Sequence, residues 1–403
     1  MTFISFNKPD INFKLVRNSL KPKDEFGVEL AIKSFFSKMT KKKHIIITDS
    51  CRTSLYLAHK FSSTKSRLVH VSPLTCRSAI LPIIAANKDP VFTEVDKDTL
   101  LMDELFLDKN LKENSGSLQV ISLGGNMNNM EKIKRICKEK NLILIEDCAQ
   151  SFGSSYKGSF SGSFGDISCF SLSKNLYSFG GGILALDDSK IFSKINDFYS
   201  KVHKQSYLSS FYKIVKYLLD TSSNNVLSAS LYKYLQKLSI TNKSSNISNF
   251  NKLKRPNSIT INSIYFQLRR FKEMERQRMK NAKYLIKNLP SNGFFSEQRI
   301  TPNTKSSFVR LYLNSKVSSK NINLESNNLD IQFRHLKSRY GCLIQDDFIK
   351  DKTISKYGKT SLSKNYFSIH GNLISVPLSS KMSNEDKNVI INFLKNKSNE
   401  YNN

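Results

Sequence analysis

The stretch IEDCAQSFGSSYKGSFSGSFGDISCFSLSKNLYSFGGGILAL, residues 145–186, combines an apolar run, an acidic pair and a glycine-rich segment. Its acids, Glu146 and Asp147, end the run LILIED (142–147), which we predict to be a strand. Open α/β sheets bind ligands at the carboxyl ends of their strands, where a carboxylate can accept a hydrogen bond from a protonated heteroaromatic nitrogen. The stretch therefore predicts an α/β sheet with a binding site at this edge.

Hydroxyl groups and a lysine follow the acidic pair in the same stretch. Ser171, Ser173 and Lys174 precede the glycines 180–182. Hydroxyls and backbone N–H groups bind phosphate, and a lysine can form an imine with an aldehyde. Pyridoxal phosphate (PLP) needs such a lysine, a carboxylate for its ring nitrogen and anchors for its phosphate. Taken singly, these features are typical of a helix cap, a surface lysine and a turn, so only their ordered combination favours a PLP site.

The flanking chain alternates apolar runs with helical patterns. Strands are expected at HIIITD (44–49), RLVHVS (67–72), PVFTEVD (90–96) and LQVISL (118–123), and helices at 54–61, 78–87 and 129–141. Strands that alternate with helices indicate a parallel sheet covered on both faces, and such strands are continuous apolar runs. We therefore predict an α/β fold with a large domain built on a mostly parallel sheet flanked by helices.

The pattern changes after residue 190. Helical spacing recurs at 211–219 and 226–238, a polar linker is expected at 241–251, a long helix from about Thr260 to Leu289, and strands at 308–313 and 373–378. We predict an N-terminal segment (1–43), a PLP-binding α/β domain (44–250) with a helical insertion at about 190–250, and a long helix with a small C-terminal α+β domain (251–403).

Composition limits the classes of partner. The 403 residues carry a formal net charge of +30, which favours anionic partners. The charge is spread along the chain, with one short run at KMTKKKH (38–44), so we expect no specific nucleic-acid binding but a small substrate that bears a diphosphate. Contact with a membrane surface stays open. No stretch has the roughly 20 apolar residues of a membrane span and the start lacks a signal-peptide pattern, so a cytoplasmic location is expected.

The cysteines predict neither a disulfide framework nor a zinc site. All six are scattered, without a CxxC pair or a neighbouring histidine cluster: Cys51, Cys76, Cys137, Cys148, Cys169 and Cys342. We expect reduced and mostly buried thiols, and no metal site.

The segment 145–186 resembles the core of the DegT/DnrJ/StrS family of sugar aminotransferases, which are PLP enzymes of fold type I. The family's E-D-A-A-Q, G-x-x-x-x-G, S-F-G-D and F-S-F patterns, and its lysine before a Gly-Gly pair, correspond to residues 146–150, 153–158, 163–166, 170–172, Lys174 and 181–182. Further similar segments are DSCRTSL (49–55), 90–96, 278–284 and SVPLSSKMSNED (375–386). The resemblance covers the chain from about residue 44 to 395.

The resemblance implies two catalytic residues. Lys174 matches the Schiff-base lysine, which also moves the proton between the cofactor and substrate carbons. Asp147 matches the acid that keeps the pyridine nitrogen protonated.

The resemblance also implies cofactor contacts. Gln150 matches the residue near the phenolic oxygen, Ser171 a phosphate ligand, and Arg52 with Thr53 the turn that supplies further phosphate contacts. A neighbouring subunit completes the phosphate site in this family, which implies a homodimer. Asn257 is the candidate for that contact.

Three positions depart from the family pattern. The segment between Phe170 and Lys174 is shorter by about two residues than the commoner form. Cys51 stands where the phosphate turn has glycine, and the residue near Cys76 replaces an aromatic side chain that often stacks on the pyridine. Cys76 is therefore expected at the cofactor without such stacking.

The sequence thus favours a PLP-dependent aminotransferase. Its substrate would be a keto sugar, nucleotide-linked, in glycan or polysaccharide precursor biosynthesis, with glutamate or glutamine as amino donor. Two alternatives stay open: a PLP-dependent sugar dehydratase of the same family, in which histidine typically replaces the lysine, and a non-catalytic basic scaffold or regulatory relative.

Overall fold

The computed structural model describes residues 4–6, 8–21, 23–62, 64, 66–111, 116–221, 230–231, 250, 252–328, 331–335 and 364–401. The predicted helix at 226–238 and the linker at 241–251 lie almost entirely outside these described residues.

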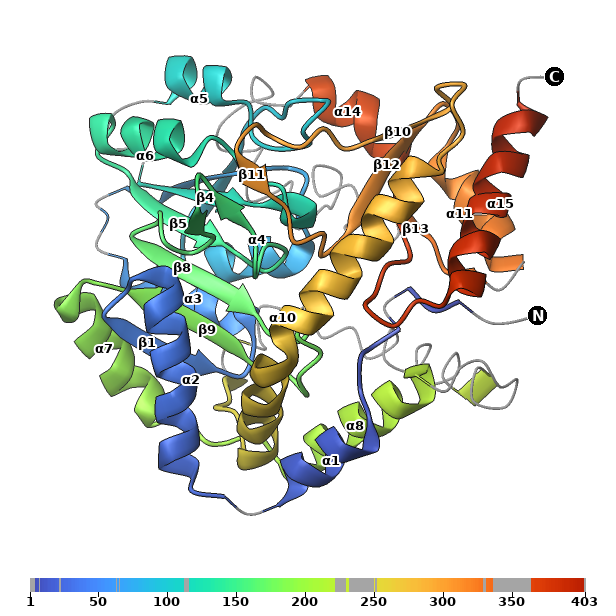
Figure 1. The fold of residues 1–403 in the computed structure, drawn as a ribbon. Helices are drawn as coiled ribbons and strands as arrows, with labels where there is room; N and C mark the ends of the chain where they lie inside the picture. Colours follow the sequence, from blue (N-terminus) through green and yellow to red (C-terminus); the bar gives the residue numbers. More distant parts are fainter. Residues whose placement is uncertain are drawn as a thin grey trace.

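A seven-stranded sheet forms the centre of the molecule (Figure 1). Its order is β1 (His44–Thr48), β9 (Gly182–Leu186), β8 (Ile167–Ser171), β5 (Ile143–Asp147), β4 (Ser117–Ile121), β2 (Leu68–Val71) and β3 (Asp89–Phe92). Strand β9 runs antiparallel to both of its neighbours, and the pairs on the β3 side of β8 are parallel. The predicted mostly parallel sheet is therefore present.

Helices cover both faces of this sheet. On one face lie α3 (Cys51–Phe61), α4 (Arg77–Ala85) and α7 (Ser189–Ser200), and on the other α2 (Glu25–Thr40) and α10 (Ser258–Lys287). Strand β1 shows why both faces are apolar, because Ile46 packs with the first set while Ile45 and Ile47 pack with the second. Two further helices, α5 (Glu104–Asn110) and α6 (Met130–Glu139), cover β4 and β5.

A second sheet forms a separate apolar core near the C-terminus. Its order is β10 (Phe295–Glu297), β12 (Leu311–Ser315), β14 (Leu373–Val376) and β13 (Arg334–His335), and it packs with α11 (Ser319–Asn328) and α15 (Asn384–Glu400). Helix α14 (Lys364–His370) packs against the β2–β3 side of the large sheet. The α+β character expected for this part of the chain is present.

Helix α10 connects the two cores (Figure 1). Its first turns, with Ile261 and Ile264, pack on the large sheet, and Ala282 and Leu285 near its end belong to the core of the second sheet. A helix of 30 residues spans about 45 Å, enough to reach across both. The domain boundaries at 43/44 and 250/251 stay predictions.

Two helices, a small sheet and a short 3₁₀-helix complete the surroundings of the large sheet. Helix α1 (Phe13–Leu20) and helix α8 (Tyr207–Thr221) both pack on the start of α10, and Thr221 Oγ1 donates a hydrogen bond to Pro9 O. A small sheet of β11 (Thr304–Lys305), β6 (Ser155–Tyr156) and β7 (Ser159–Phe160) follows β5, and the short helix η1 (Leu123–Gly125) follows β4. None of the described helices is long and apolar enough to cross a membrane.

Candidate active site

A cavity of about 300 Å³ opens where β1, β5 and β8 end. Its lining comprises Ser50, Cys51, Arg52, Leu55, Cys76, Ser78, Ala79, Asp147, Ala149, Ser171 and Lys174. The structure thus brings together five residues that the sequence assigns to the cofactor: Arg52, Cys76, Asp147, Ser171 and Lys174. A volume of this size suits a small cofactor, since ligand sites start at roughly 300 Å³.

Asp147 presents a buried carboxylate to the cavity. Its Oδ1 accepts hydrogen bonds from Ala149 N at 3.0 Å and from Cys51 Sγ at 3.9 Å, and no described residue donates to Oδ2. Burial raises the pKa of Asp147, and the positive charge of Lys174 opposes the shift. A positively charged N–H group in the cavity could therefore donate a hydrogen bond to the carboxylate of Asp147. Apart from Lys174, little positive charge balances this carboxylate.

Helix α3 begins at the cavity and offers an anion site. Ser50 is its N-cap and accepts a hydrogen bond from Thr53 N at 3.3 Å. Cys51 and Arg52 form the first turn of α3 and line the cavity, and the positive end of the helix dipole favours a phosphate at this place. Thr53 itself is turned away, because its Oγ1 donates to Asp49 Oδ1 at 2.5 Å. It supports the turn rather than lining the cavity.

The glycine triplet makes room for this helix start. A Cβ on Gly182 would lie 2.5 Å from both Cys51 N and Ser50 C, so a side chain there would push the helix start away. A Cβ on Gly181 would lie 2.6 Å from Ile264 of α10. The glycines therefore allow β9 to lie directly against the phosphate turn.

The loop that carries Lys174 is held from both sides. Asn175 Nδ2 donates to Phe152 O at 2.8 Å, and the buried guanidinium of Arg278 on α10 donates to Asn175 O at 3.3 Å. Arg278 Nε also donates to Ser307 O at 3.1 Å. The half-buried Lys174 side chain is thereby placed at the cavity despite the shortened segment that precedes it.

Gln150 lies beside the cavity but outside its lining. Its Oε1 accepts hydrogen bonds from Gly124 N at 3.2 Å and from Tyr312 Oη at 3.0 Å. Since Oε1 is occupied, the amide Nε2 is the group of Gln150 left to donate to a phenolic oxygen.

Asn257 lies away from the cavity in the single chain. It is the N-cap of α10, where its Oδ1 accepts from Thr260 N at 3.0 Å and its Nδ2 donates to Ser210 Oγ at 3.0 Å. Its contact with a neighbouring subunit stays a prediction.

The cavity wall near Cys76 consists of small side chains. Cys76 is the N-cap of α4, and Ser78 and Ala79 follow it, while Ala149 lines the cavity after β5. No aromatic side chain belongs to the lining in the described part of the chain. A planar ring would lie among small residues instead of stacking on an aromatic one.

Several lining residues are not among the sequence-predicted contacts. These residues have small or apolar side chains, whose chemistry does not mark a cofactor contact: Ser50, Cys51, Leu55, Ser78, Ala79 and Ala149. Ser50 could have been found as a typical N-cap immediately before a helix, and Ser50, Leu55 and Ala149 also lie in the segments 49–55 and 146–150 that resemble the family.

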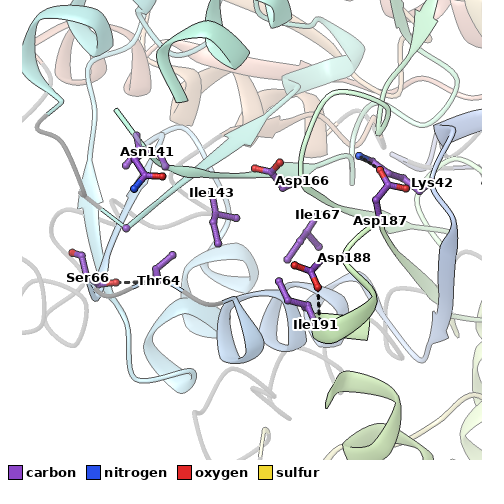
Figure 2. A pocket seen from close by; sticks show the side chains of 12 residues that line it. Lys42, Thr64, Ser66, Asn141, Ile143, Asp166, Ile167, Asp187, Asp188 and Ile191 are labelled. Atoms are coloured by element: carbon purple, nitrogen blue, oxygen red, sulfur yellow. Dashed lines mark hydrogen bonds and ion pairs between the residues drawn. The ribbon is translucent and has the colours of Figure 1, made fainter. Parts of the chain in front are cut away.

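A larger cavity, of about 710 Å³, lies at the opposite edge of the large sheet, where β5 and β8 begin (Figure 2). Its three aspartates already hold protein groups: Asp166 accepts from Leu144 N, Asp187 from Lys42 Nζ and Lys43 N, and Asp188 from the first turn of α7. It contains none of the predicted site residues. In the described part of the chain, no group of three or more His, Cys, Asp or Glu could hold a metal.

The described cysteines are free thiols, and Cys51 is the one that contacts Asp147. Burial raises the pKa of the Cys51 thiol, so the group stays protonated and donates.

With an amine, a buried carboxylate and a helix start in one cavity, the residues present fit PLP: Lys174 would hold the aldehyde carbon, Asp147 the ring nitrogen, and Ser171 with α3 the phosphate.

Solved structures share the fold over nearly the whole chain. The aminotransferase TlmJ from Streptoalloteichus hindustanus has a TM-score of 0.75 at 16% identity and covers 98% of both chains. PseC of Helicobacter pylori, an aminotransferase involved in pseudaminic acid biosynthesis, has a TM-score of 0.73 at 16% identity. The predicted fold type I architecture is thereby confirmed.

Curated relatives match a shorter part of the chain. The UDP-4-amino-4,6-dideoxy-N-acetyl-beta-L-altrosamine transaminase of Campylobacter jejuni (strain 81-176) is 32% identical over 158 residues, 38% of this chain and 42% of the relative. The GDP-perosamine synthase of Escherichia coli O157:H7 is 27% identical over 183 residues, 43% and 50% of the two chains. The matched segments span half or less of these relatives.

A family model also matches more than half of the chain, residues 29–249. This range contains Arg52, Asp147 and Lys174, the residues that the cavity brings together. The resemblance noted in the sequence is confirmed, and the chain belongs to the DegT/DnrJ/EryC1/StrS aminotransferase family.

Proposed function

We propose that this protein is a PLP-dependent aminotransferase that moves an amino group from an amino acid, glutamate or glutamine, to a keto sugar linked to a nucleotide. One observation carries the proposal: Lys174, Asp147 and the start of α3 border a single cavity. An amine, an acid and an anion site are the three protein groups that PLP chemistry requires.

Each group has one task. PLP, when bound, supplies an electron sink for the carbon that loses its proton. Asp147 would hold the proton at the ring nitrogen. Lys174 Nζ would move a proton from the donor carbon to the cofactor in one half-reaction and from the cofactor to the sugar carbon in the other. Ser171 and the start of α3 would hold the phosphate, and this anchor would orient the cofactor toward Lys174.

The nucleotide-linked substrate is supported by relatives and by charge. The names of three relatives contain a nucleotide-linked sugar: one sugar is linked to UDP, one to GDP and one to dTDP. A net charge of +30 favours association with a diphosphate. A place in glycan or polysaccharide precursor biosynthesis and a cytoplasmic location agree with such a substrate.

A sugar dehydratase of the same family remains the second candidate. The fold does not separate the two, because the dehydratase GDP-4-keto-6-deoxymannose-3-dehydratase has a TM-score of 0.74 to this chain. Lys174 favours the aminotransferase, since a histidine typically stands at this position in the dehydratases. The cavity at Lys174 likewise favours an enzyme over a scaffold.

A homodimer is part of the proposal. Helix α8 exposes a line of apolar side chains, Leu208, Phe211, Tyr212 and Val215, spaced so that they share one face. A second copy of the chain would bury this face. Sedimentation velocity of wild type and Phe211→Asp tests it, with a dimer expected for wild type and a shift toward monomer for the variant.

The half-reaction with an amino donor tests the activity without knowledge of the sugar. PLP-loaded wild type should convert glutamate to 2-oxoglutarate once per active site, and Lys174→Ala should form none. Lys190→Ala, at an exposed lysine in the first turn of α7, is the matched control and should behave as wild type. Equal yields from wild type and Lys174→Ala would contradict the proposal.

A further inference from the structure

Helix α8 sends one lysine toward the start of α3. A Cβ on Gly180 would lie 2.7 Å from Lys213 Nζ and 3.5 Å from the backbone O of Asp49, so the Lys213 ammonium lies beside the turn that carries Asp49. Because Gly180 has no side chain, the half-buried Lys213 ammonium can reach this turn from α8. Lys213 lies in the segment 190–250, which the sequence distinguishes as an insertion.

Asp49 is built into the turn that would hold the cofactor phosphate. Its Oδ1 accepts from Thr53 Oγ1 at 2.5 Å and from Ser50 Oγ at 3.3 Å, and its backbone O accepts from Gly181 N at 2.8 Å. A carboxylate directly behind an anion site repels a phosphate that binds there. The turn therefore needs Asp49 for its shape but carries an unfavourable negative charge.

Two basic side chains act on the carboxylate of Asp49 and favour its ionised form. Burial raises the pKa of Asp49, and the positive charges of Arg52 and Lys213 oppose the shift. Burial likewise lowers the pKa of Lys213, and the charge of Asp49 opposes that. Arg52 faces the cavity, with its guanidinium 5.9 Å from the centre of the Phe250 ring, whereas Lys213 approaches from the α8 side.

We infer that Lys213 is a positioning residue of the cofactor site: its ammonium neutralises Asp49, so that the start of α3 binds the PLP phosphate without repulsion from the carboxylate behind it. Helix α8 is thereby part of the cofactor site rather than a peripheral insertion. This inference rests on the proposed function only in that PLP binds with its phosphate at α3.

The affinity for PLP and for pyridoxal, which lacks the phosphate, tests the inference by equilibrium dialysis. Lys213→Met should weaken PLP binding by about tenfold and leave pyridoxal binding unchanged, because the lost charge acts on the phosphate. Lys213→Arg should bind PLP as wild type does. Asp49→Asn keeps the acceptor for Thr53, so Lys213→Met combined with Asp49→Asn should restore PLP affinity to within about threefold of wild type.

Two results would overturn the inference. Equal losses of PLP and pyridoxal binding in Lys213→Met would assign Lys213 a role in folding alone, and failure of Asp49→Asn to restore binding would show that Asp49 is not the group it neutralises. A wild type that binds PLP with the predicted Lys213 dependence but does not deaminate glutamate would contradict the proposed function and leave this inference standing.

Discussion

At the scale of the residue, the buried Asp147 lowers the stability of the folded apoprotein when its carboxyl ionises. Burial raises the pKa of Asp147 above its usual value of 3.8, with the charge of Lys174 opposing the shift. Ionisation of the folded apoprotein is therefore unfavourable. Below pH 3.8 the Asp147 carboxyl is protonated in both the folded and the unfolded state, so it does not lower the free energy of unfolding. The loss of stability is complete once the pH exceeds the raised pKa of the folded state.

Asp147→Asn should remove this loss of stability. We expect the apoprotein of the variant to melt no lower than wild type at neutral pH, with the difference in melting temperature shrinking as the pH falls toward the usual pKa of the carboxyl. Thermal melts of both proteins over this range of pH show whether the variant melts above or below wild type. A variant apoprotein that is less stable at neutral pH would show that the carboxylate is compensated without the cofactor.

The same substitution should impair chemistry, because an asparagine cannot hold a proton at the ring nitrogen. The rate of the half-reaction with glutamate should fall on the order of 100-fold while PLP stays bound. Asp188→Asn is the matched control, since Asp188 is a helix N-cap that does not line the cavity of Lys174, and asparagine caps equally well. Equal rates in wild type and Asp147→Asn would remove Asp147 from the mechanism.

Gly182 should tolerate no side chain. The 2.5 Å approach of its Cβ position to Cys51 N and Ser50 C predicts that Gly182→Ala displaces the start of α3, with a loss of about 1–3 kcal/mol in the free energy of unfolding and weaker PLP binding. Gly371→Ala is the control, because nothing lies within 4 Å of its Cβ position. Chemical denaturation and PLP titration measure both effects, and unchanged PLP affinity in Gly182→Ala would contradict this geometry.

At the scale of the element, α10 holds the loop of Lys174 through the buried Arg278. Arg278→Met leaves the carbonyl groups of Asn175 and Ser307 without a donor, so we expect a loss of about 2–3 kcal/mol in the free energy of unfolding. Arg276→Met on the same helix should leave the melting temperature unchanged, because Arg276 is exposed and its ion pair among the described residues is with the exposed Glu273. Equal melting of both variants would contradict this role of Arg278.

The elements also show what the sequence could predict. The runs at 44–49 and 142–147 match β1 and β5 closely, because strands covered by helices on both faces are continuous apolar runs. Helix α2 was not predicted, although Val28, Ile32 and Phe36 recur every fourth residue and are buried. The expected strand at 308–313 starts later, at Leu311, since Phe308 has a φ of 45° that an extended strand does not allow.

Other features are invisible in a single sequence. An apolar run has no direction, so nothing in 182–186 indicates that β9 runs antiparallel to its neighbours. The order of Asp147 and Lys174 in the stretch 145–186, together with the family resemblance, predicted them at one site, and the structure places both at one cavity. The approach of Lys213 to Asp49 could not be predicted, because it depends on where α8 packs.

At the scale of the whole molecule, the net charge of +30 should act on the diphosphate of a substrate. Raising the ionic strength from about 0.05 M to 0.5 M should weaken UDP or GDP binding several-fold, because screening shortens the reach of the positive surface. The corresponding nucleosides carry no phosphate and should bind independently of salt. Titration calorimetry measures both, and a salt-independent affinity for the nucleotides would show that the charge does not serve the substrate.

The central claim is that this chain binds PLP through Lys174 in the cavity between α3 and β5. The most direct test is to incubate the protein with stoichiometric PLP, reduce the cofactor–lysine bond with borohydride, and locate the added mass by peptide mass spectrometry. We predict one label per chain, on Lys174, with none on Lys190 or Lys213. Labels scattered over exposed lysines, with Lys174 unmodified, would contradict the account.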